Sequence, residues 1–570
     1  MKKPSLPQNN SIPYYKSHPD LIICFLIVIL IFITYTQTLG FDFVWDDIRI
    51  SQNPNIDAGI TAEGIKWAFK LRNGLTYWHP FSWISHMLDI QIFGMNPAGH
   101  HLSNILIHAA NCLLLFTLLR LMTGSLWRST LVTTLFALHP LNVESVAWIA
   151  ERKNVLSTFW GLLTILSYYR YTQQKGKYIY PVVILLFSMS LLTKPMLITL
   201  PIILLLLDFW PLKRYKTKRT GQDSAQGSNR YHFLGSDAKI LSILFLEKVP
   251  LLVCSYLSYR MTSISMAEIA PNKSLFVSTH SVPLLLRIEN IFVSLVNYLR
   301  DLFLPINLGC FYPMPDTLPL WEVIVSLALL IAITFLVIRF YPKRPNLLIG
   351  WFWFCISIAP VSGIIRIGAY PARADRFTYF PFIGLFIILS WGIYDLLGKR
   401  PKIKFLIITL IISIYCMTLT MHQMQYWKNE VSLYSRAIKV TSKDNVYMRM
   451  NLSQAVTNEG IILLSQDKVD ASINKFKSAI IINSKNESSF NGLGVALSKK
   501  GHDEVAIYYL EKAIEIDPDY QLAHYNLGIL FSKNKNYEKS LIHFTKVLQL
   551  DPNNESSVKY VKKALSMINK

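Results

Sequence analysis

Two adjacent carboxylates, Asp46 and Asp47, are the residues of this chain best placed for proton-transfer chemistry. They follow a long apolar run, at the point where a first membrane span would leave the bilayer. A carboxylate in that position could take the proton from an acceptor hydroxyl, and two like charges so close together tend to raise one pKa. The alternative interpretation is a solvated turn that ends the helix. Either aspartate could be the base.

Cations form a second set of candidates, because they lie in segments that we place on the same outer face. Such cations break the usual excess of Lys and Arg in cytoplasmic loops. They are Arg152, Lys194, Arg366, Arg373 and Arg376. We expect Arg376, Lys194, Arg152 and Arg373 to bind the phosphate of an anionic lipid. The alternative is an internal ion pair, such as that of Arg376 with Asp375 or Glu144.

A third set of polar residues is expected to support these two. It consists of His79, Asp89, His101, His139 and Glu144. His101, Asn104 and His108 share one face of a predicted helix, and polar residues at membrane depth usually face the protein interior or a cavity. The histidine spacing is not diagnostic of a metal site, and we expect no metal, because the cations can stabilise the phosphate.

The elements that position these residues are predicted to be membrane helices. Of the 570 residues, 52% are hydrophobic and 16% are charged, whereas a soluble domain has roughly 25% charged residues. The net charge of +22 comes from Lys and Arg in short loops between apolar segments, which is typical of topology signals. That pattern argues against a nucleic-acid-binding protein.

Eleven apolar stretches approach the length of about 20 residues that a membrane span needs. They are 20–38, 102–122, 129–147, 154–170, 178–193, 195–211, 241–259, 319–339, 347–365, 378–397 and 402–421. A twelfth stretch, 286–304, carries charges. We place this stretch at the outer surface, because the basic loops are then cytoplasmic. The segment 39–101 is then the first outer loop, and the C-terminal domain is outside. If the stretch crosses the membrane instead, the C-terminal domain is cytoplasmic.

The C-terminal part is predicted to be an all-α repeat solenoid. The dipeptides that recur 34 residues apart are Asp517-Pro518 with Asp551-Pro552, and Leu493-Gly494 with Leu527-Gly528. This period and these positions are the signature of tetratricopeptide repeats. We therefore predict two domains, a polytopic helical domain over 1–424 and a repeat domain over 425–570. Such repeats bind extended peptides on a concave face; the alternative is a rigid spacer.

The order of these motifs resembles a known family. The motifs are Phe43-Val44-Trp45-Asp46-Asp47, Asn53-Pro54, His139-Pro140 with Glu144, and Ala374-Asp375-Arg376-Phe377-Thr378-Tyr379-Phe380-Pro381, all ahead of the repeats. They look like the transmembrane and tetratricopeptide-repeat-containing (TMTC-like) O-mannosyltransferases, which have the C-type glycosyltransferase fold. The chain departs from the eukaryotic pattern at Trp78-His79-Pro80-Phe81, where those members have Tyr-Arg-Pro-Leu.

The resemblance implies an inverting glycosyltransferase that needs no cofactor and uses a polyprenyl-phosphate sugar, mannose or another hexose. Its acceptor would be a Ser or Thr hydroxyl of a protein. The family's acidic pair corresponds to Asp46-Asp47, and its Glu-Arg corresponds to Asp375-Arg376. We expect a relative in a bacterial inner membrane, with the repeats outside. Two other functions stay open: a membrane-anchored scaffold without enzymatic activity, and a transferase that acts on a lipid or polysaccharide.

Overall fold

The computed structural model describes residues 19–71, 78–174, 178–215, 238–267, 282–363, 371–398, 401–441 and 445–568. The chain forms two compact units, Met1–Asn429 and Glu430–Lys570, whereas the sequence prediction divided it after residue 424. Both units are helical, as predicted. Within the described ranges, the strand-like pairing is an isolated bridge between Tyr312 and Arg373. Arg366 lies outside the described residues.

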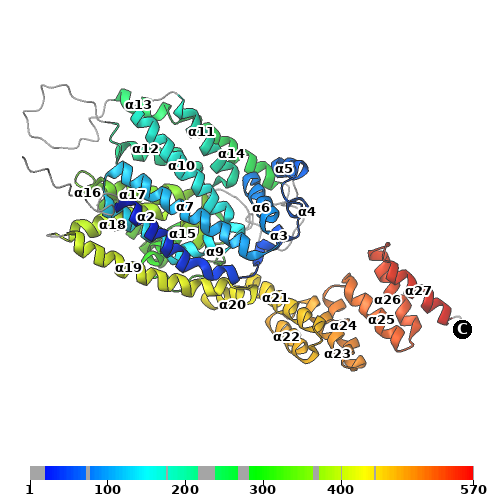
Figure 1. Ribbon diagram of the computed structural model, residues 1–570. Coiled ribbons are helices and arrows are strands. Elements are labelled where there is room, and N and C mark those ends of the chain that lie inside the picture. The colour runs from blue at the N-terminus through cyan, green and yellow to red at the C-terminus, as the bar shows by residue number, and fades with distance from the viewer. Residues whose placement is uncertain are drawn as a thin grey trace, which may run out of the picture. The chain divides into compact units, whose positions relative to one another are not determined.

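The first unit contains helices long and apolar enough to cross a membrane (Figure 1). Among the described residues, four pass by length and composition, and a bent pair makes up to five. The four are α2 (Pro19–Tyr35) with η1 (Thr36–Gly40), α7 (Pro97–Thr123), α16 (Leu320–Phe340) and α19 (Pro401–Met424). The bent pair is α13 (Ala238–Leu246) and α14 (Val249–Ala267), with an angle of 41° between them.

Helices also form at the other predicted apolar stretches, but several are short for a span. They are α8 (Leu126–Leu138), α10 (Arg152–Gln174), α11 (Ile179–Thr193), η5 (Pro195–Thr199) with α12 (Leu200–Phe209), α17 (Pro345–Ile358) and α18 (Phe382–Leu396). Helices α10 and α11 lie side by side (Figure 1). The count of eleven spans therefore stays a prediction.

The predicted span 129–147 is wrong in one respect, because its helix ends at Leu138. Pro140 disfavours the helical conformation at the residue before it, and His139 is accordingly extended, with φ −71° and ψ 133°. Three short turns of helix follow: η3 (Pro140–Asn142), α9 (Val143–Ala147) and η4 (Ile149–Glu151). This irregular segment brings Glu144 and Glu151 to the start of α10.

Helix α15 (Leu284–Phe303) is the stretch whose crossing of the membrane was in question. Its buried face holds the segment that precedes Arg376: Asn290 donates a hydrogen bond to the Ala372 carbonyl at 2.8 Å, and the Tyr298 hydroxyl donates to that of Ala374 at 3.1 Å. Its opposite face exposes leucine and isoleucine side chains. Its location at the outer surface stays a prediction.

The second unit is a row of consecutive antiparallel helices, drawn yellow to red in Figure 1. They are α20 (Glu430–Val440), α21 (Val446–Ser465), α22 (Val469–Ile482), α23 (Glu487–Lys499), α24 (Asp503–Ile516), α25 (Gln521–Lys533), α26 (Tyr537–Leu550) and α27 (Glu555–Ile568). Glycines let the two helices of a repeat approach closely. A Cβ atom at Gly528 would lie 2.8 Å from the Phe544 ring.

The contact between α22 and α23 gives a prediction for stability. A Cβ at Gly492 would lie 2.4 Å from the Phe476 ring, and Phe476 is fully buried. Gly492→Val should therefore lower the free energy of unfolding of the repeat unit by about 1–3 kcal/mol through overpacking. Pulse proteolysis of the full chain across a urea series measures this. Ser478→Ala, on the exposed side of α22, is the control and should change it by under about 0.5 kcal/mol; equal midpoints would contradict the prediction.

Candidate functional site

The backbone turns sharply at the acidic pair, so that its two carboxylates point in different directions. Trp45 has a φ of +54°, a left-handed conformation that is costly for a bulky side chain and is concentrated at functional sites. Asp47 is fully buried, and its carboxylate accepts hydrogen bonds from the Val44 and Ala150 backbone N–H groups at 3.0 and 2.7 Å. Burial outweighs these bonds and raises the pKa of Asp47 to about 8.

Asp46 is the accessible member of the pair. Its side chain is 36% exposed, and its Oδ1 lies 3.4 Å from Nε of Arg49. Asp47 joins the turn after α2 to the segment around Ala150, whereas Asp46 is open to a substrate.

A stack of tryptophans connects this turn to the cationic residues. The rings of Trp45 and Trp148 are parallel, with centroids 4.8 Å apart, and Trp427 contacts Trp148 at 5.9 Å. The Arg376 guanidinium lies 5.4 Å from the Trp148 ring centroid, and Lys153 Nζ lies 5.5 Å from it. Asp46 therefore directly follows Trp45, whose ring stacks on Trp148, the tryptophan that both cations contact.

Three cations surround one buried carboxylate, Glu151. Lys194 Nζ lies 2.8 Å from a Glu151 oxygen, Lys153 Nζ lies 3.2 Å away and Arg376 Nε lies 3.5 Å away. The side chain of Glu151 is 2% exposed, and those of the three cations are 12–20% exposed. Burial alone would raise the pKa of Glu151, but the cations hold it down at about 2. We call these four residues the cation cluster.

Glu144 fixes Arg376 in place at the edge of the cation cluster. The Arg376 backbone N–H donates to Glu144 Oε2 at 2.7 Å, and the guanidinium pairs with the other carboxylate oxygen. Asn154 in turn donates to the Arg376 carbonyl at 2.7 Å. Burial raises the pKa of Glu144. Three cations (Lys153, Lys194 and Arg376) against two carboxylates leave at least one positive charge in excess, so the region suits an anion.

Two of the predicted phosphate ligands lie in other ion pairs. Arg152 is 1% exposed, and its Nη2 lies 2.7 Å from Asp89 and donates to the His100 carbonyl at 2.7 Å. Arg373 pairs with Asp301, and its guanidinium lies 3.9 Å from the Tyr312 ring centroid. Both guanidinium groups are therefore committed to buried partners, and their side chains, 1% and 9% exposed, are less accessible than that of Arg376, which is 14% exposed.

The predicted histidines occupy different surroundings. His79 is buried where α6 (Pro80–Phe93) begins, and burial together with the charges of Lys153 and Lys194 lowers its pKa to about 3. His139 Nε2 bonds the Leu302 carbonyl at 3.0 Å, which ties η3 to α15. The ring of His101 packs edge-on against Phe41, with centroids 6.2 Å apart. Of the three, His79 is the one close to the cation cluster.

The sequence prediction missed Glu151, Lys153 and Trp148 as members of this site. A signal was present, because Glu151-Arg152-Lys153-Asn154 is a charged run next to a tryptophan in an otherwise apolar region. From that run the prediction selected Arg152, whose side chain points away from the cation cluster.

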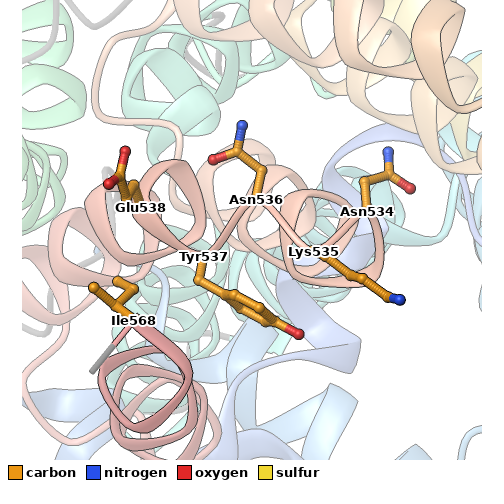
Figure 2. Close-up of a pocket in the computed structure, with 6 residues that line it drawn as sticks. All are labelled: Asn534, Lys535, Asn536, Tyr537, Glu538 and Ile568. Carbon is orange, nitrogen blue, oxygen red and sulfur yellow. The ribbon is translucent and has the colours of Figure 1, made fainter. Parts of the chain in front are cut away.

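A separate hollow in the second unit is lined by Asn534, Lys535, Asn536, Tyr537, Glu538 and Ile568 (Figure 2). It lies at the turn between α25 and α26, beside the end of α27. Its lining is mostly polar and open to solvent, and it contains none of the predicted site residues.

Comparisons with known proteins confirm the repeats. The tetratricopeptide repeat family matches residues 488–520 and 522–554. Among solved structures, the Sgt2 TPR domain from Aspergillus fumigatus is 20% identical, with a TM-score of 0.20, and the match covers 20% of this chain and 79% of that one.

Curated relatives match the membrane part as well. Protein O-mannosyl-transferase Tmtc2 of Drosophila melanogaster is 32% identical over 165 residues, which are 28% of this chain and 18% of the relative. Protein O-mannosyl-transferase TMTC3 of Homo sapiens is 22% identical over 466 residues, which are 76% of this chain and 49% of the relative. The chain thus covers less than half the length of each of these relatives. The chain is thus similar to TMTC-type protein O-mannosyl-transferases over most of its length, and it carries tetratricopeptide repeats.

Proposed function

We propose that this chain is a glycosyltransferase that moves a sugar from a polyprenyl-phosphate donor to a Ser or Thr hydroxyl of a protein. The observation that carries the proposal is the cation cluster, which has excess positive charge and packs through Trp148 against the turn that bears Asp46. The cations suit the phosphate of a donor, and the Asp46 carboxylate suits the hydroxyl of an acceptor. The names of the relatives support the same activity.

In the proposed reaction, Asp46 takes the proton of the acceptor hydroxyl. The hydroxyl oxygen attacks the anomeric carbon from the face opposite the phosphate, through a transition state with oxocarbenium character. As the bond to the phosphate breaks, the electron pair leaves with the phosphate oxygen, and the configuration inverts. Arg376, Lys194 and Lys153 stabilise that growing charge. No metal or cofactor takes part in the transfer.

The repeat unit is proposed to bring the protein acceptor to this site. Tetratricopeptide arrays bind extended peptides, and an unstructured Ser/Thr-containing segment has that form. The reaction would take place on the outer face of a bacterial inner membrane, where the repeats are also proposed to lie. The sugar would be mannose or another hexose.

The test is a transfer assay with the full chain in lipid nanodiscs. It contains polyprenyl-phosphate mannose, or the corresponding glucose donor, and a Ser/Thr-rich peptide. Mass spectrometry of the peptide should show an added hexose, and NMR of the glycopeptide should show an anomeric configuration opposite to that of the donor. A chain that binds the peptide but transfers no sugar from either donor would contradict the proposal and favour a scaffold.

The environment of Lys194 predicts a pH dependence. Burial lowers the pKa of Lys194 to about 8, although Glu151 opposes that shift. The ammonium is therefore present below pH 8 and is lost as the pH rises through that value, so affinity for the donor phosphate should fall. We expect the donor KM to rise above about pH 8, and Lys194→Arg to move this rise to higher pH, because Arg stays protonated. A KM that is flat from pH 7 to 9.5 would contradict this.

A further inference from the structure

Three possible metal ligands meet between α6 and α7, beyond the cation cluster. His86 and Asp89 are three residues apart on α6, so they share a helix face. His100 lies in the first turn of α7, after the bend at Gly94. All three side chains are buried, with 1%, 4% and 0% of their surface exposed, respectively.

The ligand atoms of these side chains point toward one another. One atom from each residue lies within 4.8 Å of the other two. His100 Nδ1 is 3.5 Å from Asp89 Oδ2, close to the separation of about 3.3 Å between two ligands on a tetrahedral zinc ion. The Nδ1 atoms of His86 and His100 are buried without a hydrogen-bond partner, and buried polar atoms are rarely left so.

Neighbouring groups hold two of the ligands in a form that can bind a metal. His100 Nε2 lies 3.0 Å from the Gly94 carbonyl, and only a protonated nitrogen can bond a carbonyl, so the Nδ1 of the neutral imidazole carries the lone pair. Ser103 donates to Asp89 Oδ1 at 2.8 Å. Outer hydrogen bonds of this kind orient metal ligands in proteins.

Arg152 is the group that competes for the same carboxylate. Its Nη2 lies 2.7 Å from Asp89 Oδ2. A carboxylate offers about four lone-pair sites, so Asp89 can accept from Arg152 and still bind an ion. The guanidinium charge weakens the binding of a cation here, and it favours ions that form strong bonds to imidazole over those that depend on charge alone.

We propose that His86, Asp89 and His100 bind a divalent transition metal, best matched by zinc, which joins α6 to α7. Two imidazoles and one carboxylate are typical zinc ligands, whereas calcium and magnesium prefer oxygen. The ion would hold Asp89, and through it Arg152 at the start of α10, but it takes no part in the proposed transfer. From the sequence we expect no metal, and its linear spacing does not show that α6 and α7 bring these three side chains together.

The test measures metal content, so it does not depend on the proposed activity. The full chain, purified without chelator and without a polyhistidine tag, should carry about one zinc per chain by plasma mass spectrometry. His86→Gln and His100→Gln should each reduce that content at least fivefold. His422→Gln, at an exposed histidine, is the matched control and should leave it unchanged.

Two measurements on the unaltered chain keep the test decisive even if a variant folds poorly. Chelation should lower the melting temperature, and zinc should restore it. Cobalt bound in place of zinc should give the visible absorption of a four-coordinate site. An unaltered chain that binds neither zinc nor cobalt, or a His86→Gln/His100→Gln double variant with full zinc content, would overturn the proposal.

Discussion

Replacing Arg376 with Gln is expected to lower sugar transfer by about 10²–10³-fold, as is typical when one group that stabilises developing negative charge is removed. Arg376 is the best-anchored member of the cation cluster: both its backbone N–H and its guanidinium contact Glu144. Its side chain is nevertheless 14% exposed, so it can reach a ligand. Because the charge on the phosphate grows as the bond breaks, we expect kcat to fall more than donor affinity.

The measurement is steady-state transfer in nanodiscs with the donor varied. Arg376→Lys keeps a charge but loses the two-pronged geometry, so its activity should lie between those of the parent and Arg376→Gln. Arg120→Gln is a matched control, because Arg120 forms a partly exposed ion pair with Asp20 near the other end of α7. Arg376→Gln alone leaves the buried carboxylate of Glu144 without its cation, which could destabilise the fold. The double variant Glu144→Gln/Arg376→Gln removes that charge as well, so it separates a loss of folding from a loss of phosphate binding. Transfer within threefold of the parent in Arg376→Gln would contradict the phosphate role.

The apolar stretches and the 34-residue period were enough to predict where most of the long helices form, because burial in an apolar environment or in a repeat leaves a clear pattern of residue types. They did not predict that the helix in the apolar stretch 129–147 ends at Leu138. The proline after His139 ends α8 early, and the segment that follows holds both Glu144 and Glu151. The mean hydropathy of a stretch of about 20 residues changes little with a single proline, so it does not show that the helix ends there.

The neighbours Arg152 and Lys153 show why the site was predicted only in part. Successive residues of a helix point about 100° apart, and α10 begins at Arg152. Arg152 therefore reaches Asp89, and Lys153 reaches Glu151. The sequence indicates a charged run but does not indicate the residue at which the helix starts, so the direction of each side chain was not predictable. Lys194 and Arg376 were among the predicted cations, because both lie in segments that the sequence prediction placed on the outer face.

The acidic pair was predicted as a pair, but its two members could not be told apart. Their difference depends on the left-handed backbone of Trp45, and a tryptophan gives no sign in the sequence of adopting it. That turn directs Asp47 to the Val44 and Ala150 N–H groups and leaves Asp46 exposed. It is the structural basis for choosing Asp46 as the proposed base.

Asp46→Asn should therefore lower kcat by about 10²–10⁴-fold, the usual contribution of a general base. The amide has nearly the size of the carboxylate but cannot take the proton of the acceptor hydroxyl. Because the side chain is 36% exposed and pairs only with Arg49 at 3.4 Å in the described contacts, the folded chain should accumulate normally. The donor KM should change little, since the phosphate is held by the cation cluster.

Asp47→Asn should behave differently. One of its two backbone hydrogen bonds would be lost, because the amide nitrogen cannot accept, and a buried N–H left without a partner costs about 1–3 kcal/mol. We expect a lower melting temperature, with the kcat of the folded fraction reduced only a few-fold. Asp57→Asn, at an exposed position of the same segment between α2 and α7, is the control for both variants. If Asp47→Asn loses turnover while Asp46→Asn keeps it, the roles are exchanged. If both keep turnover within a few-fold, neither aspartate is the base and the cation cluster must work with another proton acceptor.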